Sequence, residues 1–430
     1  MNTYQYPDPS TWQNLIQRPV LEKQNLRSTI QEVFEKVKNE GDEALKLYTQ
    51  KFDSAEIIDF KVSIEEIENA KSLISKELKE AIQIAKSNIT VFHESQKEIP
   101  QKIETIQGVT CWRESRGIEK VGIYIPGGTA PLFSTVLMLA IPATIAGCKE
   151  IILCTPPNRN GEVNPSILYA ADLCGVTQIF KVGGSQAIAA LANGTKTIIK
   201  VDKIFGPGNQ YVTAAKEYAT ELGVAIDMPA GPSEVLVIAD ETAIPAFCTA
   251  DLLSQAEHGA DSQVIFIATN EAIFNETLEQ VQIQLEELPR KELAQKAIEN
   301  SRFILVKTFE EAIQLSNLYA PEHLILATEK AEDFIPKITN AGSVFLGNYS
   351  CESAGDYASG TNHTLPTNGY ARNYSGVSLD SFIKKITFQK LSAQGIQNLG
   401  KTIELMAEAE GLEAHKNAVS IRLKSIEDAR

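Results

Sequence analysis

The sequence has no excess of basic charge and no apolar stretch that would make an ordinary membrane-spanning helix. Its 430 residues carry 40 Lys and Arg against 55 Asp and Glu, a formal net charge of −15. That balance argues against nucleic-acid and anionic-membrane partners, because both bind basic faces. The segment from Val121 to Cys148 carries no charged side chain, but Pro126, Pro131 and Pro142 interrupt it, and a lipid-spanning helix rarely contains so many prolines. We therefore expect no nucleic-acid partner and no membrane span.

Cysteine is sparse, and its spacing indicates no disulfide framework. The six cysteines lie far apart and form no Cys-x-x-Cys pair, a pattern typical of reduced thiols in the cytosol. The opening residues contain neither the basic region nor the apolar core of a signal peptide. We therefore expect a cytoplasmic protein. Cys148 ends a small-residue apolar helix, where burial is expected, and Cys111 lies in a predicted strand beside Trp112. We therefore interpret both thiols as unreactive.

The sequence also lacks the common nucleotide and zinc-protease signatures. No Gly-x-Gly-x-x-Gly follows a predicted strand, and no Walker lysine loop or His-Glu-x-x-His occurs. Glycine turns do follow three short apolar runs, at Gly127-Gly128, Gly183-Gly184 and Gly206-Pro207-Gly208-Asn209. One such turn is as often an ordinary loop as a ligand site. Three of them at the carboxyl ends of parallel strands favour a nucleotide site.

Two hydrophobic periodicities divide the chain. Apolar residues recur at helical spacing through residues 26–94. From residue 121 onward, short apolar runs alternate with helix-like stretches, which predicts βαβ units and parallel sheets, and two similar halves raise the hypothesis of an old duplication. Residues 347–374 form a long polar loop, and residues 393–430 return to helix. The predicted strands are Val121–Ile125, Ile151–Cys154, Ile179–Val182, Val201–Phe205, Val235–Ile238, Val264–Ile267, Phe303–Val306, Leu324–Ala327 and Val344–Leu346.

Two of the five histidines lie in polar pairs that could carry chemistry. Gln255 and His258 are three residues apart near the end of a predicted helix, so they share one face. A lone Gln-x-x-His is a poor metal signature and is more often a surface pair. Glu322-His323 precedes a predicted strand, where a carboxylate and an imidazole could divide proton transfers. Such a pair is more often structural, and the residues alone leave both interpretations open.

Several long motifs, in order along nearly the whole chain, resemble those of the histidinol dehydrogenase family. Their number and length make the resemblance very specific, and one departure is Cys351, where relatives tend to carry proline. The motifs are Val121-Gly-Ile-Tyr-Ile-Pro-Gly-Gly-Thr-Ala-Pro-Leu-Phe133, Phe205-Gly-Pro-Gly-Asn209, Ile226-Asp-Met-Pro-Ala-Gly-Pro-Ser-Glu234, Leu253-Ser-Gln-Ala-Glu-His-Gly259, Tyr319-Ala-Pro-Glu-His323, Glu352-Ser-Ala-Gly-Asp-Tyr-Ala-Ser-Gly-Thr-Asn-His363 and Ala414-His-Lys-Asn-Ala418.

The resemblance implies a reaction and a set of site residues. The reaction is the oxidation of L-histidinol to L-histidine through bound L-histidinaldehyde, with two NAD consumed, in the last steps of histidine biosynthesis. Glu322 and His323 are implied as the catalytic acid–base pair. One zinc ion per subunit is implied, held by Gln255, His258, Asp356 and His415, all of which also bind substrate with the catalytic pair. Further implied substrate contacts are Ser233, His363 and Glu410, and the implied NAD contacts are Tyr124, Gln186 and Asn209.

The resemblance also implies an α/β fold of two incomplete Rossmann-like parallel-sheet domains with small helical segments at both ends. We expect a helical segment over residues 1–24 and a first domain from residues 25–120 with 235–378, which carries the zinc and catalytic residues. Residues 121–234 form the expected NAD domain. Residues 379–430 are the expected helical tail of a homodimer, reaching into the partner's site.

Three other functions stay open on the sequence. A metal-dependent hydrolase could use the same Gln, His, Asp and His set with a carboxylate base. A binding protein that lost its activity would not need the Glu322-His323 pair, so the pair argues against it. A cysteine-based aldehyde dehydrogenase is disfavoured because no thiol has an activating context.

Overall fold

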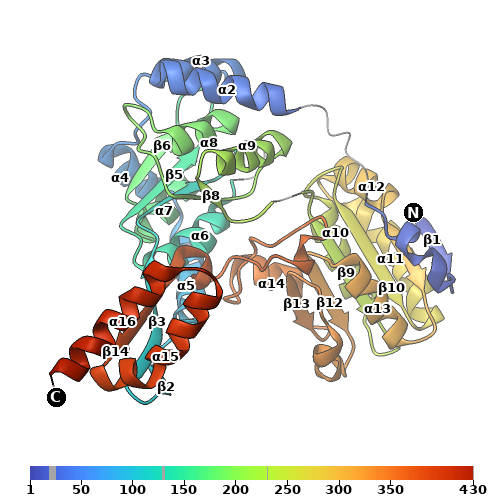
Figure 1. The fold of residues 1–430 in the computed structure, drawn as a ribbon. Helices are drawn as coiled ribbons and strands as arrows, with labels where there is room; N and C mark the ends of the chain where they lie inside the picture. The colour runs from blue at the N-terminus through green and yellow to red at the C-terminus, as the bar shows by residue number, and fades with distance from the viewer. Residues whose placement is uncertain (19–25, 128–130, 230, 430) are drawn as a thin grey trace. The chain divides into compact units, whose positions relative to one another are not determined.

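The computed structural model describes residues 1–18, 26–127, 131–229 and 231–429. Contacts divide the chain into two units, the larger formed by Met1–Gln96 with Ile118–Phe382 and the smaller by Lys97–Gly117 with Ile383–Arg430. The larger unit contains two parallel sheets, and the smaller contains one antiparallel sheet and a helix pair (Figure 1). No helix in the described part of the chain is both long and apolar enough to cross a bilayer.

Sheet B contains the four strands expected between residues 121 and 205 and a short fifth one. All its pairings are parallel and its order is β6-β5-β4-β7-β8. The chain starts in the middle, builds outward on one side and then crosses to the other, which is the doubly wound order of a Rossmann-like half. The strands are β4 (Lys120–Tyr124), β5 (Glu150–Thr155), β6 (Gln178–Lys181), β7 (Lys203–Phe205) and β8 (Ala225–Ile226).

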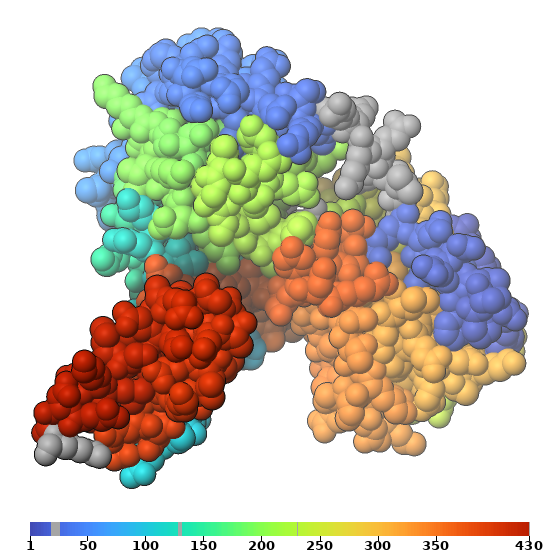
Figure 2. All heavy atoms as spheres, in the orientation of Figure 1, coloured from blue at the N-terminus to red at the C-terminus, as the bar shows by residue number. Residues whose placement is uncertain are grey.

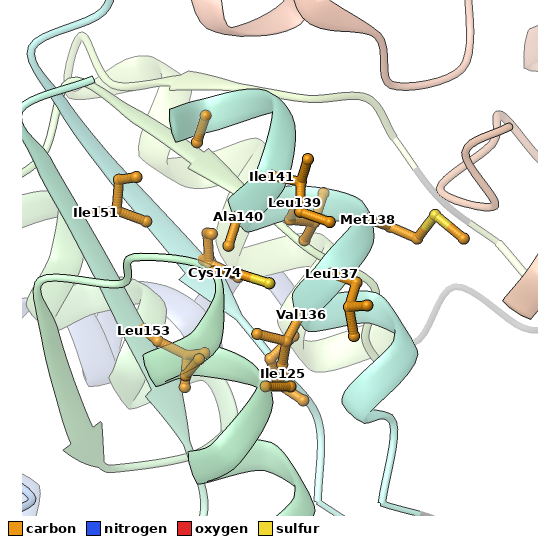
Figure 3. Packing of buried hydrophobic residues seen from close by; sticks show 14 of the residues in the cluster. Ile125, Val136, Leu137, Met138, Leu139, Ala140, Ile141, Ile151, Leu153 and Cys174 are labelled. Atoms are coloured by element: carbon orange, nitrogen blue, oxygen red, sulfur yellow. The ribbon is translucent and has the colours of Figure 1, made fainter. Parts of the chain in front are cut away.

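Helices cover both faces of sheet B. Because side chains alternate along a strand, Ile151 and Leu153 of β5 join one buried cluster while Ile152 and Cys154 join the other. Figure 3 shows the first cluster around α6, whose apolar surface on all sides accounts for the charge-free run in the sequence. The helices are α2 (Leu26–Glu40), α3 (Asp42–Asp53), α4 (Ile64–Leu73), α5 (Lys76–Glu94), α6 (Phe133–Ala146), α7 (Pro165–Leu173), α8 (Gly184–Asn193) and α9 (Gln210–Glu221).

The helices α2–α5 pack differently from the grouping expected on the sequence, in which residues 25–120 belonged with 235–378. α2 contacts α8 and α9, α4 contacts α7, and α5 contacts α6. Their apolar faces complete the two cores of sheet B, so this helical region belongs with residues 121–234. Helical periodicity shows which face of a helix is buried but not which sheet covers it.

Sheet A contains the five strands expected between residues 235 and 346, all parallel, and a sixth strand that was not expected. Its order is β1-β11-β10-β9-β12-β13. Without β1, this is again the doubly wound order of sheet B. The strands are β1 (Asn2–Gln5), β9 (Glu234–Ala239), β10 (Gln263–Ala268), β11 (Arg302–Leu305), β12 (His323–Ala327) and β13 (Ser343–Leu346).

Helices α10–α12 cover one face of sheet A, and α1 with α13 covers the other. The expected helical segment over residues 1–24 is therefore wrong at its start, because β1 is a strand paired with a partner far along the chain; residues 19–24 lie outside the described residues. The expected loop at 347–374 contains one short α-helix, α14, and a 3-10 helix, Tyr370–Arg372. The helices are α1 (Trp12–Leu15), α10 (Pro245–Ala256), α11 (Glu271–Glu287), α12 (Lys291–Glu299), α13 (Phe309–Tyr319) and α14 (Glu352–Tyr357).

The smaller unit is built on a three-stranded antiparallel sheet with the order β14-β3-β2. The expected wholly helical tail over 379–430 is therefore corrected, because the nine residues of β14 pair along the whole of β3. Beyond β14 the tail is helical as expected, and α15 and α16 pack on each other. The elements are β2 (Ile103–Ile106), β3 (Val109–Gly117), β14 (Ile383–Leu391), α15 (Ala393–Ala409) and α16 (Glu413–Asp428).

Candidate active site

A cluster of buried polar residues lies at the amino edge of sheet A, where its strand order reverses between β9 and β12. Glu234 begins β9 and His323 begins β12, with Glu322 just before it. Helices run back against parallel strands, so the end of α10 brings Gln255 to the same edge. The short helix α14 adds Asp356. Four of the expected site residues therefore meet here: Gln255, Glu322, His323 and Asp356.

The hydrogen bonds around Glu322 and His323 orient both side chains. Glu322 Oε2 accepts from the backbone N–H of Glu234 at 2.9 Å and from Gln255 Nε2 at 3.3 Å. His323 Nδ1 is 3.2 Å from the carbonyl oxygen of Glu234. A carbonyl can only accept, so Nδ1 carries the proton and Nε2 is left facing Asp356 Oδ1, 3.5 Å away. His323 therefore points its second nitrogen into the cluster.

Several atoms of the cluster are buried without a hydrogen-bond partner, namely Gln255 Oε1, His323 Nε2, Glu352 Oε2 and Asp356 Oδ1. Ligand atoms of His323, Glu352 and Asp356 lie within 4.8 Å of one another. Buried acceptors that converge without a donor are costly unless something binds them. Nitrogen and oxygen donors without a thiolate suit a divalent cation such as zinc at a site that keeps a position for substrate. The donor set therefore fits a metal ion.

Burial and charge shift the pKa values of the Glu322-His323 pair upward for different reasons. Burial raises the pKa of Glu322 to about 7, against the opposing pull of His323 and the N–H of Glu234. Burial alone would lower the pKa of His323, but the carboxylates of Glu352, Glu322 and Asp356 outweigh it and raise this pKa to about 10. The two groups therefore compete for protons as a coupled pair.

The remaining expected substrate and metal residues of the larger unit surround this cluster. His258 is exposed and interacts electrostatically with Asp356 and His323. His363 Nδ1 lies 2.7 Å from the backbone oxygen of Asp356, and its Nε2 lies 3.0 Å from Thr135 Oγ1 at the start of α6. Ser233 directly precedes Glu234 and is partly buried. The sequence thus located residues that the fold gathers from five separate segments.

The three expected NAD contacts line one cavity of about 1370 Å³ at the carboxyl edge of sheet B. Tyr124 ends β4 and its hydroxyl accepts from the N–H of Gly184 at 3.1 Å. Gln186 is 1% exposed and neither its amide nitrogen nor its oxygen has a partner. Asn209 caps α9 by accepting from two backbone N–H groups. One of the glycine turns expected at this edge is Gly127-Gly128, and its second residue, Gly128, lies outside the described residues.

A buried ion pair holds the turn at Gly206 beside this cavity. Asp227 Oδ2 accepts from the N–H of Gly206 at 2.8 Å, and Lys216 Nζ donates to the carbonyl oxygen of Gly206 at 2.8 Å. Lys216 and Asp227 also contact each other, with side chains 4% and 1% exposed. Gly206 has φ +125°, and a Cβ there would clash with the carbonyl oxygen of Tyr124. Only glycine fits this close approach.

The last two expected site residues lie in the smaller unit. Glu410 is the C-cap of α15 and His415 lies in the first turn of α16. Both are exposed, and α15 and α16 form an outer surface of this unit (Figure 2).

Sequence reasoning missed Glu352 and Glu234 as members of the cluster. Glu352 is four residues before Asp356, a spacing that puts both carboxylates on one face of a helix, so this signal was available. Glu234 ends one of the family motifs, but no spacing to another polar residue indicated its place in the cluster. The cysteine expectation is supported by burial, which raises the pKa of the Cys148 thiol to about 11.

The chain is similar to known proteins of one family over nearly its whole length. The family model described as histidinol dehydrogenase matches residues 16–423. The histidinol dehydrogenase of Bacteroides thetaiotaomicron is 58% identical over 426 residues, 99% of this chain and 100% of that protein. The histidinol dehydrogenase of Vibrio parahaemolyticus is 51% identical over 419 residues, which are 97% of this chain and 96% of that protein. The crystal structure of histidinol dehydrogenase from Elizabethkingia anophelis is 65% identical, with a TM-score of 0.98 and 99% of each chain covered. The chain therefore belongs to the histidinol dehydrogenase family.

Proposed function

We propose that this chain oxidises L-histidinol to L-histidine through bound L-histidinaldehyde and consumes two NAD as substrates. Family membership gives the reaction class. The observation that carries the proposal is the buried Glu322-His323 pair beside unpartnered nitrogen and oxygen atoms, because an oxidation of this kind needs a proton acceptor and a means of orienting the alcohol.

We assign the zinc ion to Gln255, His258, Asp356 and His415, the last contributed by the partner subunit. The free Oε1 of Gln255 and Oδ1 of Asp356 support this set. When bound, the ion supplies a Lewis-acid anchor that orients the substrate's imidazole and amine.

His323 is the base for both oxidations. Its Nδ1 is held by the carbonyl of Glu234. The carboxylates that raise the pKa of His323 would be offset by a bound cation, and Nε2 can then accept the proton of the substrate hydroxyl. Loss of that proton and of one hydride from carbon gives the aldehyde. After His323 has released this proton to solvent and water has added to the aldehyde, the same nitrogen accepts a hydroxyl proton of the hydrate while the second hydride passes to a second NAD. The carboxylic acid product then ionises.

Glu322 is the base that activates this water. Its carboxyl group has a pKa raised to about 7, close enough to neutral pH for proton transfer in either direction. The N–H of Glu234 and the amide of Gln255 hold Oε2, which leaves Oε1 for the water molecule. The two adjacent residues thus divide the proton transfers of the two half-reactions.

Ser233, His363 and Glu410 are the further substrate contacts in this proposal, and Tyr124, Gln186 and Asn209 contact NAD. The unpartnered amide of Gln186 in the cavity of sheet B supports the second group. Because His415 and Glu410 are exposed on a separate unit, we propose a cytoplasmic homodimer in which each tail completes the partner's site.

The test is NAD reduction followed by absorbance, with L-histidinol as substrate. We expect activity that is lost on chelation and returns with zinc, with two NAD reduced per histidinol. No reduction with L-histidinol, with metal present, would contradict the proposed function. Activity unaffected by a chelator that removes all bound metal would contradict the metal assignment alone.

A further inference from the structure

An arginine outside every motif noted in the sequence is bound to the residue that holds the catalytic pair. Arg18 Nε lies 2.5 Å from Glu234 Oε1, and its Nη2 lies 2.8 Å from Glu234 Oε2. Nη2 also donates to the backbone oxygen of Tyr319 at 3.0 Å, and the guanidinium carbon lies 3.9 Å from the centre of the Tyr319 ring. The side chains of Arg18 and Glu234 are 18% and 3% exposed. The Tyr319 ring therefore packs on the flat face of the guanidinium group, and the Glu234 carboxylate and the Tyr319 backbone oxygen bind its edge.

The backbone of Glu234 contacts both catalytic side chains. Its N–H donates to Glu322 Oε2 at 2.9 Å, and its carbonyl oxygen lies 3.2 Å from His323 Nδ1. Toward β12 the strand pairing begins only at the next residue, Val235. On the side of β9 that faces β12, the backbone N–H and carbonyl of Glu234 therefore contact the Glu322 and His323 side chains. Elsewhere along β9, backbone groups on this side pair with β12. A shift of this one residue would move both catalytic groups together.

The side chain of Glu234 fixes that backbone from the other direction. Both of its oxygens are bound by Arg18, and Oε1 also accepts from the N–H of Asn368 at 3.0 Å. A buried ion pair contributes little net stability, because desolvation offsets the attraction, but a bidentate pair defines geometry well. The Arg18–Glu234 pair is therefore suited to fixing the position of the Glu234 backbone.

We propose that Arg18 and Glu234 are positioning residues for the oxidation, with Arg18 setting the backbone of Glu234 and Glu234 setting Glu322 and His323. The inference rests on the proposed roles of Glu322 and His323. Neither positioning residue touches the reacting atoms. Their effect is on how often the base and the water-activating carboxylate are correctly placed once substrate is bound.

The test compares Arg18→Ala with the matched control Arg302→Ala. Arg302 donates to the backbone oxygens of Leu15, Asn300 and Ser301, so it anchors the same N-terminal segment without touching Glu234. We expect Arg18→Ala to lower kcat by roughly 10–100-fold, as small misplacements of catalytic groups do, with KM for histidinol and NAD within about threefold of wild type. Arg302→Ala should lower the melting temperature and leave kcat unchanged.

Chemical rescue separates positioning from a general loss of folded protein. Guanidinium ion added at concentrations that leave wild type unaffected should restore part of the kcat of Arg18→Ala, because it can bind the Glu234 carboxylate, and should not change Arg302→Ala. If Arg18→Ala does not fold, Arg18→Lys decides, since lysine keeps the charge but cannot bind both oxygens with a planar fork. A lower kcat with unchanged KM would support the proposal.

A folded Arg18→Ala protein, or failing that Arg18→Lys, with wild-type kcat would overturn the inference. An equal loss of kcat in Arg302→Ala would also overturn it, because the effect would then belong to the N-terminal segment. Wild-type protein without histidinol-dependent NAD reduction would instead contradict the proposed function, so the two failures are distinguishable.

Discussion

Glu322 and His323 are neighbours in the chain, and burial shifts their pKa values in opposite directions. For a carboxyl group, burial and nearby carboxylates both favour the protonated form, and they raise the pKa of Glu322. For an imidazole, burial disfavours the protonated form, and only the surrounding acids reverse that effect in His323. Two adjacent residues in one buried cluster can therefore perform separate proton transfers.

Substitution of each residue should separate the two half-reactions. We expect Glu322→Gln to oxidise added histidinaldehyde far less well than it oxidises histidinol, because only the aldehyde must first add water. His323→Ala should lose both oxidations, by the 10²–10⁴-fold typical of a missing general base. Single-turnover NAD reduction with each substrate measures the two steps. Equal losses in both steps for Glu322→Gln would refute this division.

Asp53 makes stability depend on pH in a predictable direction. It ends α3 beside the cavity of sheet B, and burial raises its pKa from 3.8 to about 6. The unfolded chain therefore loses this proton at lower pH than the folded protein does, and the residue costs stability increasingly as pH rises from about 4 to 6. A shift of this size corresponds to at most ~3 kcal/mol, which partial exposure reduces to ~1 kcal/mol.

We expect Asp53→Asn to unfold at a higher temperature than wild type at pH 8, measured without NAD, and at nearly the same temperature at pH 4. Thermal unfolding followed by circular dichroism across this range checks the expectation. A variant that is less stable than wild type at pH 8 would show that the carboxylate has a compensating partner.

At the scale of single elements, the Gly206 turn shows how a strand end can be held rigid. Both polar groups of Gly206 are bound by the Lys216-Asp227 pair, which is inaccessible to water. The turn carries Asn209 to the cavity four residues after the end of β7. Rigidity here should therefore affect NAD binding more than the chemical step.

Lys216→Met should leave the Asp227 carboxylate buried without its partner, which typically costs about 3–5 kcal/mol. We expect a higher KM for NAD, with kcat near wild type once NAD is saturating. The control is Lys203→Met. Lys203 lies in the strand leading to the turn and donates to the backbone oxygen of Ser381, and it acts on Asp227 only through a longer-range electrostatic interaction. The control should lose about 1 kcal/mol and keep its KM. Equal KM changes in both variants would contradict the role given to the turn.

The strands of the two parallel sheets were predictable, while the rest of the element map was less so. Nine apolar runs bounded by turns became nine of the eleven strands in the two parallel sheets. β1 has four residues and mostly exposed side chains, and β14 alternates only weakly between buried and exposed positions, so neither carries a clear strand periodicity. The family assignment, which rests on the family model and the similar relatives, favours an oxidoreductase over the hydrolase alternative.

The site itself divides in the same way. Residues in long motifs, such as His323 and Gln255, could be identified from the sequence, because the family resemblance names them. The contact between Arg18 and Glu234 could not be identified, although Glu234 ends one motif, because it joins segments more than 200 residues apart. Spacing along the chain predicts which residues are neighbours on one helix or strand. It does not predict pairs of residues that only tertiary structure brings together.

At the scale of the whole molecule, the two parallel sheets share one strand order once β1 is set aside, as expected for a duplicated half. Their polar sites differ, however. Sheet B presents the cavity with Tyr124 at the carboxyl ends of its strands, and sheet A presents His323 at an amino end. If the halves share an ancestor, the second site arose at the edge that such sheets seldom use.

Subunit mixing tests whether the tail serves a partner. His415→Asn and His323→Ala subunits, each inactive, are unfolded together and refolded. In an exchanged-tail dimer, one site in each mixed dimer combines an intact body with an intact tail, so about a quarter of wild-type activity should return. Activity at background would mean that each tail completes its own site. Each variant refolded alone is the control.

The pairing of β1 with β11 has a consequence for how the protein is made. Asn2 lies opposite Arg302, so β1 has no partner until some 300 further residues have left the ribosome. The helices α2–α5 and sheet B are complete well before that point and can fold on emergence, since synthesis favours N-terminal parts. Until β1 docks, β11 is an open sheet edge able to pair with other chains. The strand β1 therefore closes the later of the two parallel sheets, and crowded nascent chains are exposed to edge-to-edge aggregation in that interval.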